Sequence, residues 1–160
     1  MKLKQILVSL VAVAGLSLAA VNADAAPSSK FIGTWNLDLS KMPASPPPPK
    51  SITLVTADAG GGKWKTSVTT VDAAGKTSSN EVTYAVDGKD NPVTGDPTID
   101  ADAFSSPDPN TLVIVQKKGG KLVDTLTTVL SADGNTQTAT TVGTGADGKP
   151  TSTNGVWKRK

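Results

Sequence analysis

Two carboxylates are candidates for acid–base chemistry in this chain. Glu81 is its only glutamate, and Asp124 lies within an otherwise apolar pattern. A pair of carboxylates that meet across a cleft at about 5 to 10 Å could hydrolyse a glycosidic bond. The simpler interpretation places Glu81 on an outer face, opposite Tyr84, and Asp124 near a barrel mouth or a polar cavity. The spacing alone does not choose between these interpretations.

The densest acidic stretch of the chain offers oxygen ligands of the kind that calcium prefers. Its spacing fits no EF-hand loop, and such runs are common in turns. Asp100 and Asp102 are two residues apart, so we expect them to share one face of a strand and to be solvated there. We therefore predict no metal site in this stretch, which comprises Asp87, Asp90, Asp96, Asp100 and Asp102.

The residue types that are missing limit the chemistry further. The chain has no histidine and no cysteine, which removes the commonest general base, the commonest zinc ligand and the Ser-His and Cys-His nucleophile pairs. The G-x-S-x-G motif of serine hydrolases is also missing. We therefore expect a protein that is not an enzyme and that uses no cofactor.

The first 25 residues have the pattern of a secretory signal peptide. Two lysines give a positive start, an apolar run spans residues 6–20, and small residues stand at Ala23 and Ala25. The apolar run is shorter than the ~20 residues that span a bilayer as a helix. We expect cleavage between Ala25 and Ala26, and no cysteine is present there for lipoprotein attachment. The predicted location is the periplasm or the medium, and residues 26–160 are expected to form a single domain.

The charge balance excludes several classes of partner. The formal net charge is only +2, so the chain has no electrostatic reason to bind nucleic acid or anionic lipid. Small lysine clusters are explained as protection of sheet edges. An outer-membrane barrel needs an outward apolar band, whereas here one face of most strands is polar. We expect no membrane insertion, and the sequence identifies no protein partner.

The remaining residues read as strands separated by turns. Apolar residues alternate with polar ones in segments of about ten residues, as antiparallel sheets with one wet face require. Asp-Gly and Gly-Gly pairs between the segments are typical of hairpin ends. The clearest alternation is in the first segment, where the apolar face carries Phe31, Gly33, Trp35, Leu37 and Leu39.

The number of segments bears on whether the sheet closes on itself. We count nine clear segments and a short tenth one near residues 92–94, and proline-rich connections interrupt the rhythm at residues 42–50 and 90–110. First and last strands pair antiparallel only when the strand number is even. The expected fold is therefore an all-β, antiparallel up-and-down barrel of 8–10 strands. A half-open barrel or a sandwich is the alternative.

The first segment resembles the start of the lipocalins and fatty-acid-binding proteins of the calycin superfamily, through the sequence from Phe31 to Trp35. In that superfamily the tryptophan of the Gly-x-Trp motif plugs one end of the barrel, and a basic residue of the last strand packs across its ring. The resemblance implies these roles for Trp35 and for Arg159 or Lys158. A cation over an indole ring is physically favourable.

The chain is also similar to small secreted bacterial lipocalin-like proteins of unassigned role. That similarity covers residues 31–35, 47–51 and 87–95, and the strand rhythm in general. The chain departs from the lipocalins in having no Thr-Asp-Tyr motif in its middle. The proline-rich arm leaves no room for the helical lid of the fatty-acid-binding proteins. The resemblance therefore implies a barrel and a role for Trp35, but no ligand.

Two functions from different classes fit these features. The first is an exported binding protein that holds a small, partly apolar or amphipathic molecule inside a barrel, with Trp64, Tyr84 and Phe104 lining the site. The second is an interaction or inhibitor protein that has a filled core and acts through the loops at residues 42–50 or 90–110. The volume of the interior separates them, since ligand sites usually enclose ~300 Å³ or more.

Overall fold

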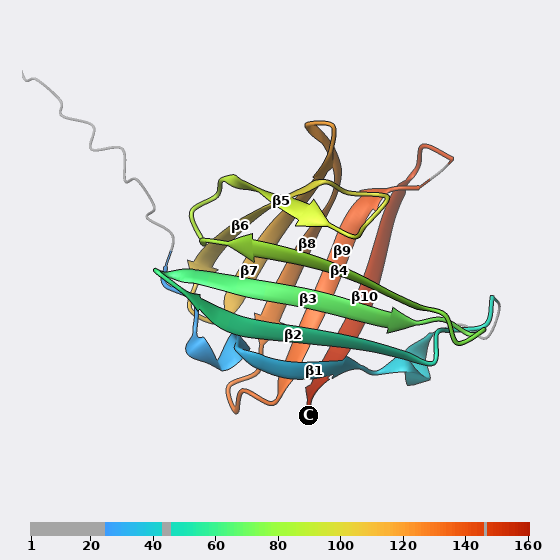
Figure 1. Cartoon of the computed structure of the whole chain (residues 1–160), viewed down its shortest axis with the longest axis horizontal. Coiled ribbons are helices and arrows are strands. Elements are labelled where there is room, and N and C mark those ends of the chain that lie inside the picture. Colours follow the sequence, from blue (N-terminus) through green and yellow to red (C-terminus); the bar gives the residue numbers. More distant parts are fainter. Residues whose placement is uncertain (1–24, 43–45, 146) are drawn as a thin grey trace, which may run out of the picture.

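Ten strands follow one another along the chain and form one closed antiparallel barrel (Figure 1). The computed structural model describes residues 25–42, 46–145 and 147–160. Two short 3₁₀ helices, η1 (Ser29–Phe31) and η2 (Leu39–Lys41), flank the first strand. The strands are β1 (Gly33–Leu37), β2 (Ser51–Gly60), β3 (Lys63–Val71), β4 (Thr77–Tyr84), β5 (Asp90–Thr94), β6 (Ala101–Asp108), β7 (Thr111–Lys118), β8 (Lys121–Leu130), β9 (Thr136–Thr144) and β10 (Pro150–Arg159).

The barrel closes through pairing of its first and last strands. Each strand pairs with its neighbours in sequence, and β1 pairs with β10 with Trp35 opposite Arg159 and Leu37 opposite Trp157. The strands at the front of Figure 1, β1–β4, cross those at the back, β7–β10, as the tilted strands of a barrel do. The prediction of an up-and-down barrel with an even number of strands is confirmed. The short tenth segment is β5, and with it the number of strands in the barrel is even.

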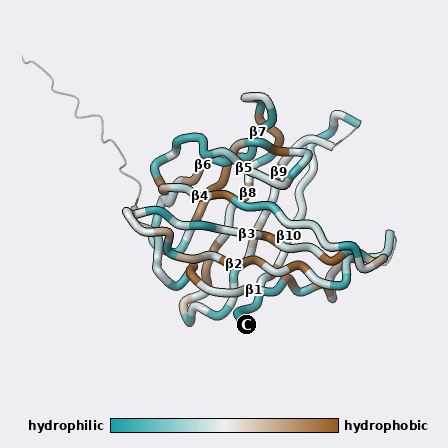
Figure 2. Tube along the Cα trace, in the orientation of Figure 1, coloured by the Kyte–Doolittle hydropathy of each residue, from teal (hydrophilic) through white to brown (hydrophobic). Residues whose placement is uncertain are grey.

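Alternating side chains explain why these segments form a barrel wall. Hydrophobic and hydrophilic residues follow one another along strands such as β2 (Figure 2). Inward positions of neighbouring strands meet in register, for example Ile52 opposite Thr70 and Leu54 opposite Val68. Many of the outward positions carry threonine, a β-branched residue that suits a pleated and half-exposed surface.

Close packing fills one end of the interior. One buried cluster consists of Phe31, Trp35, Leu112 and Leu130. A second buried cluster, formed by Val82, Tyr84 and Phe104, lies beside it, and Trp64 packs against both clusters. Most of the large aromatic side chains of the chain are therefore used at one end of the barrel.

Trp35 and Arg159 hold that end together. Trp35 is fully buried, and its indole nitrogen donates a hydrogen bond to the carbonyl of Phe31 at 3.0 Å. The guanidinium carbon of Arg159 lies 4.1 Å from the centre of the Trp35 ring. Lys158, the other basic candidate, is exposed. The same guanidinium donates hydrogen bonds to the carbonyl oxygens of Lys30, Ile32 and Gly134.

This arrangement explains the glycine of the Gly-x-Trp motif. Gly33 has a φ of +146°, and a Cβ atom at this position would collide with the Arg159 guanidinium. Residues other than glycine rarely adopt such a φ. A glycine is therefore favoured here for two reasons, the positive φ of the backbone and the close approach of the Arg159 guanidinium.

Some details differ from the expected pattern. Leu39 belongs to η2 rather than to the first strand. Leu122 precedes Leu126 by four residues and would share its inner face in a regular strand, yet it is 65% exposed. The β7–β8 register shifts between Gln116 and Lys117, so that Leu122 pairs with Lys117. A β-bulge of this kind reverses the face of every residue beyond it.

Part of the sequence interpretation lies outside the described residues. The predicted signal peptide falls on residues 1–24, which are not described, and on Ala25, which is. Residues 43–45 of the proline-rich arm are likewise outside the described residues, while 46–50 run without regular structure into β2. No helix within the described ranges is long and apolar enough to cross a membrane.

Candidate ligand-binding cavity

The other half of the barrel interior contains a cavity of about 350 Å³ that is partly open to solvent. It begins where the packed aromatic end stops, because Leu54, Phe104 and Trp157 line the cavity and also belong to or pack against the buried clusters. Its volume falls within the range typical of small-molecule sites. The aliphatic part of its wall consists of Ile52, Val68, Val82, Val93, Ile114 and Leu126.

Three aspartates are the charged residues of this wall. Asp96, Asp102 and Asp124 line the cavity, and none of the described lining residues is lysine or arginine. Asp102 on β6 is opposite Gln116 on β7, which in turn is opposite Asp124 on β8. Directly opposed residues point to the same face of a sheet. Asp102, Gln116 and Asp124 therefore form a polar row across the inner wall.

Asp102 is the most buried of the three carboxylates. Only 6% of the residue is exposed, and its Oδ1 atom receives no hydrogen bond from the described residues. The pKa of Asp102 is raised to about 6, mainly by burial. A hydrogen bond from Gln116 lowers this pKa in part, and the charges of Asp124 and Asp96 raise it. This carboxylate is held in an environment that disfavours its ionised form.

The expectation that Asp100 and Asp102 share a solvated face is wrong for Asp102. Asp100 precedes the first residue of β6 and does not follow the alternation of the strand. Its carboxylate accepts a hydrogen bond from the backbone of Gly119 at 2.9 Å. Asp102 lies within β6, where its register with Gln116 turns it inward.

Asp124 lies on the cavity wall, as one interpretation of the sequence expected. Its Oδ1 atom is also buried without a hydrogen-bond partner among the described residues. Burial raises its pKa, and the charge of Asp96 adds to this rise. The residue opposite it on β9 is Gly143, where a Cβ atom would lie 2.8 Å from the Cβ of Asp124. The missing side chain at Gly143 makes room for the carboxylate.

Asp96 comes from the connection between β5 and β6 rather than from a strand. Burial alone would raise its pKa, but hydrogen bonds from Thr98 and Asn80 lower it below the ordinary value. The Asn80 amide donates at 3.0 Å, and the Thr98 hydroxyl and backbone donate at 2.6 and 2.7 Å. Asp96 is therefore a well-paired carboxylate, in contrast to Asp102 and Asp124.

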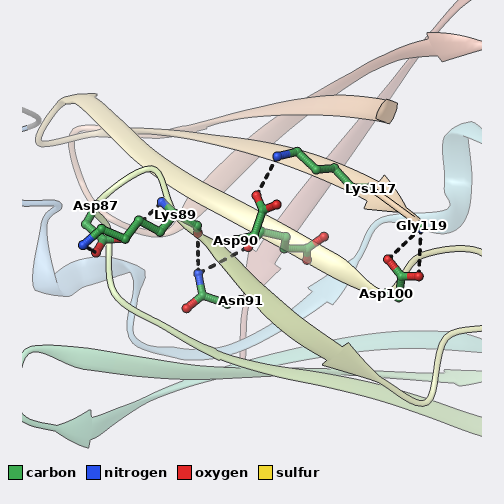
Figure 3. Close-up of polar contacts among 8 residues, drawn as sticks. Asp87, Lys89, Asp90, Asn91, Asp100, Lys117 and Gly119 are labelled. Atoms are coloured by element: carbon green, nitrogen blue, oxygen red, sulfur yellow. Dashed lines mark hydrogen bonds and ion pairs between the residues drawn. The ribbon is translucent and has the colours of Figure 1, made fainter. Parts of the chain in front are cut away.

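The other acidic residues of this region are paired on the outside of the barrel (Figure 3). Asp87 forms an ion pair with Lys89 at 3.0 Å, and Asp90 forms one with Lys117 at 2.6 Å. Within the described ranges, no three His, Cys, Asp or Glu side chains are grouped closely enough to hold a metal ion. The acidic stretch thus divides into paired outer carboxylates, the paired inner carboxylate of Asp96 and the less well satisfied inner carboxylate of Asp102.

The three aromatic residues predicted as ligand contacts are brought together. The Tyr84 ring stacks on Phe104 with centroids 3.5 Å apart, and Trp64 meets Tyr84 edge-on at 6.3 Å. Phe104 lines the cavity. Trp64 and Tyr84 line a different hollow of about 390 Å³, bordered by residues 25–27. Contact of these side chains with a ligand stays a prediction.

A chain of hydroxyl groups connects Tyr84 of the buried cluster to Thr66 of the cavity wall. The Tyr84 hydroxyl lies 3.2 Å from the Thr66 hydroxyl, which lies 3.0 Å from that of Thr56. Burial raises the pKa of Tyr84 to about 12, outweighing the hydrogen bond with Thr66 that lowers it. Tyr84 is therefore neutral at physiological pH, and its hydroxyl forms a hydrogen bond with Thr66, which lines the cavity.

Glu81 and Asp124 do not form a catalytic pair. Glu81 points outward from β4 and forms an ion pair with Lys65 at 2.8 Å. Asp124 faces the interior. The two carboxylates are on opposite sides of the barrel wall.

Most of the polar residues that line the cavity were not predicted from the sequence. Gln116, Asp102 and Asp96 were not expected to face the interior. A signal for Asp102 was present, because it stands two residues before Phe104 and must share its face within one strand. Asp96 lies in a connection, where no periodicity applies.

Neither the known family models nor the curated proteins compared with this chain give a match. The ten-strand antiparallel barrel is consistent with the calycin-like fold that the first segment implies.

Proposed function

We propose that this chain is an exported, non-enzymatic binding protein of lipocalin-like type that holds a small, partly apolar molecule inside its barrel. The observation that carries the proposal is the interior cavity of about 350 Å³, which has aliphatic walls and a few polar groups. Such a mixture is typical of small-molecule sites, where apolar walls supply affinity and polar groups fix orientation. The unfilled half of the interior favours this function over an interaction protein with a filled core.

Native mass spectrometry of the protein purified from its own host tests this function. We expect an additional mass that is lost on denaturation. Leu126→Trp should abolish it, because the larger side chain occupies the cavity that Leu126 lines. Val129→Trp is the matched control, since Val129 lies on the exposed face of the same strand. Retention of the mass in Leu126→Trp would place the ligand elsewhere, and a clean apo mass under several growth conditions would contradict the binding function.

Export is tested separately by the mass of the protein recovered from the host. We expect the mature chain to begin at Ala26 and to be found in the periplasm or the medium. A full-length chain that remains in the cytoplasm would contradict export without affecting the cavity.

A further inference from the structure

We infer that the ligand of this cavity is a small organic cation, an amphipathic amine whose ammonium group lies among Asp96, Asp102 and Asp124. The inference rests on the proposed binding function and adds the charge of the ligand to it. The cavity supplies two matched surfaces, an aliphatic wall and a polar row with acidic ends. An amine with an apolar body fits both.

The sign of the charge follows from the wall itself. The charged side chains among the described lining residues are three aspartates, with no lysine or arginine among them. The charges of Asp124 and Asp96 both raise the pKa of Asp102, so the ionised carboxylates repel one another. A carboxylate ligand would add to this repulsion, whereas an ammonium group reduces it.

The unpaired oxygen atoms show where the ammonium group binds. Oδ1 of Asp102 and Oδ1 of Asp124 are buried and accept no hydrogen bond from the described residues. Asp102 is more than nine-tenths buried and faces the cavity. A buried acceptor without a donor costs free energy, which a bound N–H donor recovers. Ammonium groups carry several such donors and form short, charge-assisted hydrogen bonds with carboxylates.

The remaining wall suits the apolar body of an amine better than a bare metal ion. Val82, Ile114 and Leu126 line the same space as the carboxylates, and Phe104 presents an aromatic side chain two residues from Asp102. Calcium requires six or more oxygen ligands within 2.3–2.6 Å. The acidic side chains of the cavity are spread over β6, β8 and the β5–β6 connection instead.

Binding should depend on pH in a defined direction. The charged groups that act on Asp102 are Asp124 and Asp96, and both are acids. Tyr84, whose pKa is raised to about 12, is neutral over the pH range of the test. Since the pKa of Asp102 is about 6, this carboxyl is protonated at pH 5 and ionised at pH 8. Alkylamines stay protonated across this range, as lysine does. The amine should therefore bind more tightly at pH 8 than at pH 5.

The test compares three probes of equal chain length, n-octylamine, n-octanol and n-octanoate, by isothermal titration calorimetry of the mature protein. At pH 8 we expect the amine to bind at least about tenfold more tightly than the alcohol, and octanoate to bind most weakly. At pH 5 the preference for the amine should shrink severalfold. The alcohol should show no such pH dependence.

Variants locate the preference. Asp102→Asn should lower octylamine affinity about tenfold and leave octanol affinity unchanged, because only the charge-assisted bond is lost. Asp124→Asn should act in the same direction. Glu81→Gln is the matched control, since it removes one carboxylate from the outer face. Circular dichroism of each variant verifies that the barrel is folded.

The outcomes separate the inference from the function on which it rests. Equal binding of amine and alcohol, both abolished by Leu126→Trp, would leave the binding function in place and overturn the charge inference. Displacement of octylamine by millimolar calcium would overturn it in favour of a metal ion. Failure of all three probes to bind, together with a clean apo mass, would overturn both.

Discussion

Asp102 shows how a single buried carboxylate sets the chemistry of an interior. Ionising it inside the wall costs free energy, because the side chain loses water and Gln116 replaces only part of the lost hydrogen bonding. Asp124 and Asp96 add repulsion. The unliganded barrel therefore carries an electrostatic cost at neutral pH, and occupants of opposite charge are favoured because binding them relieves it.

The pH dependence of stability should reveal this cost. The folded pKa of Asp102 is raised from 3.8 to about 6, so its contribution to stability is fully present below pH 3.8 and is lost as the pH rises through 6. Asp102→Asn should therefore stabilise the unliganded protein at pH 7.5, by roughly 1 to 2 kcal/mol after allowance for solvent screening. Near pH 3.5 the gain should vanish. Urea unfolding at the two pH values measures the difference.

Glu81→Gln provides the comparison for this measurement, because Glu81 lies on the outer face in an exposed ion pair. It should change stability little at either pH. A loss of stability in Asp102→Asn at pH 7.5 as large as at pH 3.5 would show that the carboxylate is structural rather than electrostatically strained.

Single residues also mark how far the sequence could predict the site. Phe104 was predicted to face the interior, and strand alternation then requires Asp102 to face it too. Solvation of Asp102 was expected because it lies in an acidic stretch and would share one strand face with Asp100, in keeping with the usual exposure of aspartates. Burial preference and periodicity disagreed at this position, and periodicity was correct. Asp96 could not be placed, since its position depends on a connection held by Asn80 and Thr98.

At the scale of elements, the end of β10 fastens the aromatic end of the barrel. Arg159 joins β10 to two other segments, because it donates hydrogen bonds to the carbonyls of Lys30 and Ile32 before β1 and to that of Gly134 in the β8–β9 connection. Its planar guanidinium also covers the Trp35 ring. A lysine in its place could not reach all these acceptors, because its ammonium is a compact point charge.

Arg159→Lys should therefore destabilise the barrel by roughly 1 to 3 kcal/mol, since several carbonyls lose a charged donor. Lys158→Arg is the matched control at the neighbouring exposed position and should have little effect. Thermal unfolding of both variants measures the difference. Equal effects of the two substitutions would show that Arg159 contributes only charge to this strand.

Strand existence was predictable from the sequence, but strand ends and bulges were not. Trp35 and Leu37 share one face of a strand, as Val82 and Tyr84 do, and this spacing of two residues depends only on which face is exposed to water. Leu122 follows the same alternation, yet the bulge between β7 and β8 turns it outward. A bulge depends on the register between two strands. No pattern within one strand encodes it.

At the scale of the whole molecule, β5 is the most weakly paired strand of the barrel, although β1 and β10 are also joined by only three residue pairs. Nine residue pairs join β9 to β10, whereas two join β4 to β5 and three join β5 to β6. Val82 and Val93 form one of these few pairs and both line the cavity. Local opening has the lowest free energy where few hydrogen bonds must break. The seam at β5 is therefore the part of the wall expected to open most readily, and it offers an additional route between the partly open cavity and solvent.

Hydrogen exchange of the backbone amides tests this route. Amides of β5 should exchange fastest among the strands and those of β9 and β10 slowest, because opening the seam breaks few pairs. Octylamine should slow exchange in β5 and in residues 95–100, since Val93, Asp96 and Ile99 line the occupied cavity. Octanoate serves as the control and should leave the exchange nearly unchanged. Exchange of β5 as slow as that of β9 would mean that the ligand enters elsewhere, and protection confined to the Trp35 end would move the ligand out of the acidic half of the barrel.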